Sequence, residues 1–365
     1  MSYSTSSTHI LVCPFAPSGH FIPLLDLTRL LLRRGLTITI VISDTNLPLL
    51  DPLLSSHPSS IHKLRLSDPD HSHSPSPSPH PLITKVIATR QLFDPIFQWF
   101  KSHPTPPAAI ISDFFLGWTN DLASHLGVRH MFSPSGALGY SIFHMLWRDA
   151  SEINALNDDR DESFMLSFPD IPNSPELPWW QLSPLWRSYK KGEPGLEGGY
   201  IDYVKKQMGH DRVWAVGPLL PDEHDPMGTT GREGSSAVPL DDLLMWLAQK
   251  RDGSVVYICF GGQGTLSEKE MKALTGALKL SNVDFVLCVQ EGVASGVMML
   301  TWPMGADQFA NAALRVDQLG VVKRICGSGP ESVPDSVELA QLLDESLNVD
   351  RPERVRAKPS SHQGS

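Results

Sequence analysis

The stretch at positions 9–42, HILVCPFAPSGHFIPLLDLTRLLLRRGLTITIVI, contains one complete strand, helix and strand, and it decides the fold. Residues 9–15 are apolar and predict a buried strand, residues 21–34 repeat apolar side chains at helical spacing, and residues 36–42 alternate Thr with Leu, Ile or Val. Gly35 ends the predicted helix. A strand, a helix and a second strand in this order predict a parallel sheet, and therefore an α/β fold.

Length and charge narrow the class of protein. The 365 residues, 41% of them hydrophobic, are enough for two domains with substantial cores. A net charge of −10, from 30 basic and 40 acidic residues, argues against general nucleic-acid binding. No run approaches the ~20 apolar residues that a spanning helix needs, so we expect no membrane insertion.

The cysteines and histidines give no clear metal-binding pattern. Cys13, Cys259, Cys288 and Cys326 lie far apart without a C-x2-C spacing, so we expect neither a zinc site nor a disulfide framework. Reduced thiols fit a cytoplasmic protein. The Pro-, Ser- and His-rich residues 67–81 favour an exposed loop over a metal-binding tract.

A second strand and helix pattern lies in the later part of the chain. Residues 213–220, VWAVGPLL, introduce it, residues 254–260 predict a strand, and residues 267–280 predict a helix. The turn GGQG, which contains Gly262, connects the last two. Such a turn can present backbone N–H groups to a phosphate, although a tight turn without a ligand explains the spacing equally well.

These patterns give the expected domain boundaries. Residues 336–347 predict the last helix, and the charged and polar residues after it have too few apolar side chains to pack. We therefore expect one α/β domain at residues 1–210, a second at 211–350, and a disordered tail at 351–365.

Two polar side chains follow predicted strands. His20 comes shortly after the strand at 9–15, and Asp113 comes directly after a strand predicted at 108–112. The carboxyl ends of parallel strands share one edge of the sheet, where the active groups of open α/β sheets gather. Histidine suits proton removal at neutral pH, and a neighbouring carboxylate can hold one tautomer of an imidazole. A helix-entry histidine and a strand-end aspartate that caps a turn are the alternative.

Three segments carry a resemblance to a known family. They are PFAPSGHFIPLLDL at 14–27, ISDFFLGW at 111–118 and EGVASGVMMLTWPMGADQ at 291–308. They resemble the signatures of plant family 1 UDP-glycosyltransferases, in particular the branch that acts on flavonoids and small phenolics. The resemblance implies two facing Rossmann-like domains of the GT-B type. It also implies UDP-glucose as co-substrate, a small phenolic acceptor, and no metal or other cofactor.

The resemblance assigns four residues to the acceptor side. His20 would take the proton from an acceptor hydroxyl, and Asp113 would support it. Phe115 and His144 fall where members of the family line the acceptor pocket. The implied reaction is an inverting displacement with a His-Asp dyad.

Four further residues match the donor side of the family. Glu291 corresponds to the residue that binds the ribose hydroxyls, and a carboxylate can accept two such hydrogen bonds. Asp307 and Gln308 correspond to the pair that binds the hexose, with Gln suggesting glucose over galactose. Gly262 stands where relatives commonly place a serine that contacts phosphate, which leaves only its backbone N–H.

One part of the family pattern has no counterpart. The sequence FVLCVQ, ending at Gln290, runs directly into Glu291, whereas the family carries Trp-Ala-Pro-Gln and His-Cys-Gly-Trp-Asn-Ser before this glutamate. Each preorganised hydrogen-bond donor at the leaving diphosphate lowers the free energy of the transition state by about 3–4 kcal/mol. General base catalysis accelerates the reaction roughly 10²–10⁴-fold, so the loss of several donors outweighs the contribution of His20. We therefore expect an incomplete second domain and very poor turnover of UDP-glucose, or none. The C-terminal helix of the family is also expected to be missing.

Two other interpretations stay open. In the first, the chain is a non-catalytic splice or gene-model variant that at most binds small phenolics. In the second it is a serine hydrolase, but SPSGALG around Ser135 lacks the G-x-S-x-G pattern of a nucleophile elbow.

Overall fold

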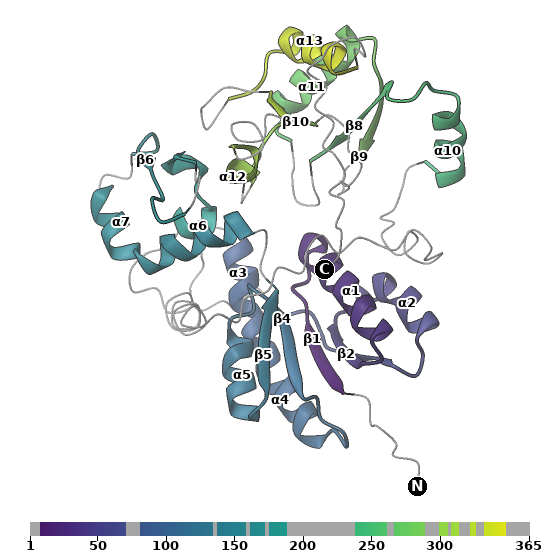
Figure 1. Ribbon diagram of the computed structural model, residues 1–365, viewed down its shortest axis with the longest axis vertical. Helices are drawn as coiled ribbons and strands as arrows, with labels where there is room; N and C mark the ends of the chain where they lie inside the picture. Colours follow the sequence, from purple (N-terminus) through teal and green to yellow (C-terminus); the bar gives the residue numbers. More distant parts are fainter. Residues whose placement is uncertain are drawn as a thin grey trace, which may run out of the picture. The chain divides into compact units, whose positions relative to one another are not determined.

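The chain folds into two compact units of α/β structure (Figure 1). Met1–Ile153 and Pro184–Glu233 form the first unit, and Asn154–Ser183 and Gly234–Ser365 form the second. The computed structural model describes residues 8–70, 81–133, 137–157, 161–171, 175–187, 238–260, 266–288, 299–305, 308–313, 322–325 and 332–347.

The first unit is built on a five-stranded sheet with the order β3-β2-β1-β4-β5, in which every pair is parallel. Successive strands run outward from β1 to β3 on one side, and the chain then returns to place β4 and β5 on the other. The order therefore reverses between β1 and β4, which is where open α/β sheets bind ligands. The strands are β1 (His9–Cys13), β2 (Thr37–Ile42), β3 (Ile61–Arg65), β4 (Ala109–Asp113) and β5 (Arg129–Ser133).

Helices cover both faces of this sheet, as Figure 1 shows, with α1 and α2 on one face and α3, α4 and α5 on the other. Burial on both faces explains why the central strands β1 and β4 are buried along their whole length and largely apolar. The helices are α1 (Ser18–Arg33), α2 (Leu47–Ser56), α3 (Pro81–Ala88), η1 (Thr89–Leu92), α4 (Phe93–Ser102), α5 (Trp118–Leu126), α6 (Ala137–Arg148), α7 (Ala150–Leu156, across the division between the units) and α8 (Pro184–Arg187).

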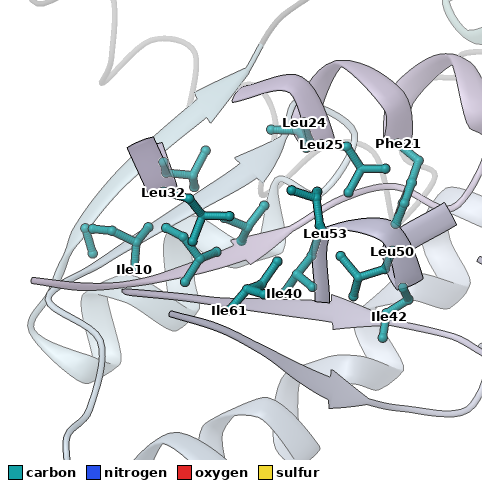
Figure 2. Packing of buried hydrophobic residues seen from close by; sticks show 14 residues of the cluster. Ile10, Phe21, Leu24, Leu25, Leu32, Ile40, Ile42, Leu50, Leu53 and Ile61 are labelled. Atoms are coloured by element: carbon teal, nitrogen blue, oxygen red, sulfur yellow. The ribbon is translucent and has the colours of Figure 1, made fainter. Parts of the chain in front are cut away.

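The core beneath α1 and α2 fixes the position of the sheet edge (Figure 2). Each fully buried Leu, Ile or Phe side chain contributes roughly 1.5–3 kcal/mol relative to exposure. Because α1 supplies a whole apolar face to this core, its first turn is held firmly above the carboxyl end of β1. The cluster contains Ile10, Val12, Phe21, Leu24, Leu25, Leu32, Ile38, Ile40, Ile42, Leu50, Leu53, Ile61, Ala109 and Ile111.

The helix α1 begins earlier than its apolar periodicity predicted. Pro17, with φ −57° and ψ 139°, is the N-cap, and its carbonyl oxygen accepts from the backbone N–H groups of His20 and Phe21 at 2.9 Å each. The first turn therefore forms before the apolar repeat begins at residue 21. As a result His20 lies inside the helix, in its first turn, and not in a preceding loop.

The second unit contains two separate parallel strand pairs among its described residues, β8–β9 and β10–β11, and one short antiparallel pair, β6–β7. Its elements are β6 (Met165–Leu166), β7 (Leu177–Pro178), η2 (Trp179–Gln181), α10 (Leu240–Ala248), β8 (Val255–Cys259), α11 (Glu268–Leu280), β9 (Asp284–Cys288), β10 (Met299–Thr301), α12 (Gln308–Ala313), β11 (Val322–Arg324) and α13 (Ser336–Leu347).

The helices α11 and α13 form the core of the second unit. A capping box starts α11, because the Ser267 side chain accepts from the backbone N–H of Glu270 and the Glu270 side chain accepts from that of Ser267. Gly276 permits the close approach of α13, since a Cβ there would lie 2.7 Å from Oγ of Ser336. The apolar side chains of both helices then pack together over β8.

Several predictions from the sequence lie outside the described residues. These are the segment 213–220 that introduces the second strand and helix pattern, the GGQG turn, the boundary at residues 210 and 211, and the tail at 351–365, so the domain boundaries stay a prediction. In the described parts of the chain, no helix is both long enough and apolar enough to cross a membrane. Within the same parts, no group of three or more His, Cys, Asp or Glu side chains could hold a metal ion.

Candidate active site

His20 and Asp113 meet at the reversal point of the first sheet. His20 Nδ1 lies 2.9 Å from Oδ2 of Asp113, the last residue of β4. The strand positions predicted this proximity, because β1 and β4 are neighbours and their carboxyl ends share one edge. The pair joins residues that are 93 positions apart in the chain.

The Asp113 carboxylate is fixed through both oxygens. Oδ1 accepts from the backbone N–H of Phe115 at 2.8 Å, while Oδ2 faces His20. Asp113 is only 4% exposed, and a buried carboxylate is stable only when hydrogen bonds compensate its lost hydration. The loop after β4 therefore supplies one of the two bonds that hold the carboxylate in place.

The hydrogen bond to Asp113 selects one tautomer of His20. An ionised carboxylate can only accept, so Nδ1 of His20 must donate, and the neutral imidazole then has its lone pair on Nε2. No described residue hydrogen-bonds to Nε2, and the His20 side chain is 23% exposed. The arrangement can take a proton from a hydroxyl at Nε2, and Asp113 would stabilise the imidazolium that forms.

Three phenylalanine rings surround the His20 imidazole. The ring centroid of Phe115 lies 4.7 Å from that of His20, Phe15 lies 5.4 Å away edge-on, and Phe114 lies 5.5 Å away. Phe15 and Phe115 are buried, and Phe114 is half-buried. Aromatic rings of this kind suit contact with a flat aromatic molecule.

A buried hydroxyl and imidazole network lies behind Asp113. Ser112 Oγ lies 2.9 Å, and Thr119 Oγ1 3.0 Å, from Nε2 of His130. Thr119 Oγ1 also donates to the Leu116 carbonyl at 2.6 Å. Burial lowers the pKa of His130 to about 4, so its imidazole is neutral at pH 7 and can accept at Nε2. The network ties β4, α5 and β5 together next to the dyad.

The residues expected on the donor side are described only in part. Gly262, Glu291 and Asp307 lie outside the described residues. Gln308 is the first residue of α12, exposed, and its Oε1 accepts from the backbone N–H of Met304 at 2.7 Å. This bond sets the orientation of the Gln308 amide, whose NH₂ group is the end that can donate to a sugar hydroxyl.

Comparison with known proteins adds a second line of observation. No family model matches the chain. UDP-glycosyltransferase 89B2 of Stevia rebaudiana is 38% identical over 443 aligned positions, which cover 97% of this chain and 92% of the relative. The flavonol 3-O-glucosyltransferase UGT89B1 of Arabidopsis thaliana is 36% identical over 443 positions, which cover 96% and 90%. The chain belongs to the plant UDP-glycosyltransferases. The resemblance found in the sequence is thereby confirmed.

Solved structures confirm the GT-B type of fold for this plant UDP-glycosyltransferase. Arabidopsis UGT89C1 complexed with UDP-L-rhamnose has a TM-score of 0.69 at 30% identity, and its complex with quercetin has 0.69 at 31%. Each comparison covers 96% of this chain and 92% of the other. UGT71G1 of Medicago truncatula, complexed with UDP-glucose, has a TM-score of 0.68 at 18% identity, which supports the fold alone.

The acceptor residues expected of this glycosyltransferase lie in the first unit. Phe115 packs against His20 and donates its N–H to Asp113. His144 lies on α6, is 9% exposed, and has a ring 6.4 Å from that of Tyr140. Burial, and secondarily the charge of Arg148, lowers the pKa of His144, so the imidazole is uncharged at pH 7.

Sequence reasoning missed three aromatic residues of this glycosyltransferase. Phe15 and Phe114 contact the His20 ring, and Tyr140 lies beside His144. The sequence could have indicated Phe15 and Phe114 as site residues, since Phe15 follows β1 closely and Phe114 directly follows Asp113. For Tyr140 the signal is the spacing of four residues to His144, which places both on one face of a helix.

Proposed function

We propose that this chain has the design of an enzyme that transfers a hexose, glucose, from a UDP-sugar to a hydroxyl group of a flavonoid-like acceptor, and that its shortened donor side leaves the unaltered chain with very poor turnover or none. The observation that carries the proposal is the His20–Asp113 pair at the reversal point of the first sheet, with Nε2 available beside phenylalanine rings. One relative is named as a flavonol 3-O-glucosyltransferase and the structure of another was solved in complex with quercetin, and both support the acceptor class.

The proposed reaction is an inverting displacement. His20 Nε2 removes the proton from the acceptor hydroxyl while its oxygen attacks the anomeric carbon. The bond from that carbon to the UDP oxygen breaks, and UDP leaves with the bonding electrons. Asp113 balances the positive charge on the imidazolium, and general base catalysis of this kind contributes roughly 10²–10⁴-fold.

Glucose is proposed as the transferred sugar on two grounds. Gln308 presents its amide NH₂ group at the start of α12, and Asp307 precedes it in the family pattern. The relative named as a flavonol 3-O-glucosyltransferase is 36% identical to this chain, whereas the one named as a flavonol 7-O-rhamnosyltransferase is 31% identical.

We further propose that the donor side is shortened. The alignments run over 443 positions although the chain has 365 residues, which supports a segment present in the relatives and absent here. Parallel sheets normally have both faces covered. Tyr257, Phe285 and Leu287 on the β8–β9 pair are nevertheless 48%, 40% and 44% exposed, which supports an incomplete second unit.

The widely spaced cysteines support a reducing, cytoplasmic location.

The transfer reaction is tested in a version of the chain that carries a family-type segment between Gln290 and Glu291. With quercetin and UDP-glucose we expect a monoglucoside, identified by mass spectrometry, and a rate lowered 10²–10⁴-fold by His20→Ala. A product formed from UDP-L-rhamnose but not from UDP-glucose would overturn the sugar assignment. An unchanged rate in His20→Ala would overturn the role of His20.

The shortened donor side that we propose favours a second candidate function. The unaltered chain would then bind small phenolics in the first unit without turning them over. Titration calorimetry separates the two candidates: this function predicts that quercetin binds and that UDP-glucose releases no heat, whereas heat from both ligands supports the transferase.

A further inference from the structure

Two cysteines that lie far apart in the sequence are neighbours in the second unit. Cys259 is the last residue of β8 and Cys288 is the last residue of β9, and the parallel pairing of the two strands brings these residues into register. Neighbouring strands of a sheet lie about 4.7–4.9 Å apart. Disulfides join residues whose Cα atoms lie about 4.4–6.8 Å apart, so the paired backbones already have a spacing that a disulfide accepts.

The two cysteines occupy the face of the β8–β9 pair that is turned away from the core of the second unit. Val256 and Ile258 pack against the core cluster that α11 and α13 form. Because successive residues of a strand alternate between the two faces, Cys259 and its partner in register lie on the opposite face, together with Tyr257. Tyr257 is 48% exposed and Cys259 is half-buried, so a small oxidant in solution can reach this face.

Cys13, in the first unit, has the opposite character. It is 1% exposed, and burial raises the pKa of its thiol to about 12. The thiolate is the form of cysteine that attacks a disulfide, so Cys13 stays protonated and unreactive at neutral pH while the chain is folded. It therefore provides an internal reference for the reactivity of the other cysteines.

The strands that carry the two cysteines have few other supports. In the described residues, β8 and β9 form a sheet of two strands only. Two strands alone are marginally stable in water, and parallel pairing is slightly weaker per residue than antiparallel pairing. A covalent bond between the two strand ends would therefore strengthen a weak part of the fold.

We propose that Cys259 and Cys288 form a reversible disulfide that ties β8 to β9 and stabilises the second unit under oxidising conditions. The inference is independent of the transfer reaction, because neither cysteine takes part in it. In a reducing compartment such a bond is transient, as is usual for disulfides that respond to the redox state.

The step is a thiol–disulfide exchange with glutathione disulfide as the oxidant. The thiolate of one cysteine attacks a sulfur of glutathione disulfide, a mixed S–S bond forms, and the first glutathione leaves as a thiolate. The thiolate of the second cysteine then attacks the protein sulfur of the mixed disulfide and releases the second glutathione. The two cysteines lose two electrons and two protons, and one glutathione disulfide becomes two glutathione thiols.

Equilibration of the purified full chain with glutathione tests the inference. The chain is incubated at fixed ratios of oxidised to reduced glutathione, free thiols are alkylated, and tryptic peptides are mapped without reduction. Cleavage after Lys279 places Cys259 and Cys288 on different peptides, so a bond between them links two peptides. We expect this linked pair as the main oxidised species, while Cys13 is alkylated only after unfolding.

Urea and two variants show whether the fold is what brings the cysteines together. In urea we expect the equilibrium constant for the link to fall at least about tenfold, because the unfolded chain no longer holds the strand ends in register. By linkage, the same factor measures how much the bond stabilises the folded chain. Cys288→Ser should lose the linked pair, and the matched control Cys326→Ser should keep it.

Three results would overturn the inference. The first is that Cys259 and Cys288 remain separate thiols, or carry separate glutathione adducts, at every glutathione ratio. The second is a main link that involves Cys326. The third is a link that forms equally well in urea, since the register of β8 and β9 would then contribute nothing to it.

Discussion

The chemistry of His20 depends on the hydrogen bond to one carboxylate. With Nδ1 donating to Asp113, the lone pair lies on Nε2, and the Phe15, Phe114 and Phe115 rings limit where that nitrogen can meet a substrate. The Asp113 carboxylate is in turn held by the N–H of Phe115. Three consecutive residues at the end of β4 and directly after it, Asp113, Phe114 and Phe115, therefore orient, enclose and fix the imidazole.

The substitution Asp113→Asn should reverse the tautomer of His20. The amide NH₂ of Asn can donate to Nδ1, and the ring proton would then move to Nε2, where no lone pair remains to accept a proton. We expect ¹⁵N NMR at pH 8 to show an Nδ1–H tautomer in the wild type and an Nε2–H tautomer in the variant. The Nε2–H tautomer in both proteins would contradict the orientation described for the dyad.

Single residues were predictable from the sequence where strand ends decided their position. His20 and Asp113 are of this kind, because parallel topology alone brings the ends of β1 and β4 together. The contacts of Phe15 and Phe114 were not predictable, since ring orientation depends on packing that no periodicity encodes. Glu291 and Asp307 lie outside the described residues, so their assignment to the donor side rests on the sequence alone.

At the scale of elements, β4, α5 and β5 are joined by hydrogen bonds that include a titratable group. Ser112, Thr119 and His130 connect the three elements directly beside Asp113. His130 remains neutral in this network because burial lowers its pKa to about 4, against about 6.5 in the unfolded chain. The stability of this part of the sheet therefore depends on pH.

Acid should weaken the fold through His130. Between pH 6.5 and 4 the unfolded chain binds a proton at His130 and the folded chain does not, so this contribution is fully present above pH 6.5 and is lost as the pH falls toward 4. The variant His130→Gln keeps a hydrogen-bonding side chain but cannot titrate. Urea unfolding should show that the wild type loses up to about 3 kcal/mol more than the variant between pH 7 and 4. Parallel pH profiles would count against a neutral His130.

The start of α1 shows why element boundaries were harder to predict than element types. The apolar repeat predicted a helix from residue 21, but hydrogen bonds to the Pro17 carbonyl extend it back to Ser18. Backbone capping is not recorded in apolar periodicity. The last helix, Ser336–Leu347, has the predicted bounds, and it packs against α11.

At the scale of the whole molecule, the described parts of the two units differ in how their strands pair. The first unit has a closed apolar core beneath α1 and α2, with the dyad at its sheet edge. In the described residues of the second unit the parallel strands form separate pairs, and large apolar side chains on β8 and β9 are exposed. The direct junction of Gln290 and Glu291 predicted an incomplete second domain, and this stays a prediction. We therefore propose intact acceptor activation in the first unit and a weakened donor site in the second.

The most direct test compares two proteins in one assay: this chain, and the same chain with a family-type segment inserted between Gln290 and Glu291. Both are incubated with UDP-glucose and a panel of flavonoids, and glucosides are quantified by mass spectrometry. The account predicts product only with the insert, because hydrogen-bond donors at the leaving diphosphate contribute about 3–4 kcal/mol each in the transition state. Comparable product formation by both proteins would contradict it.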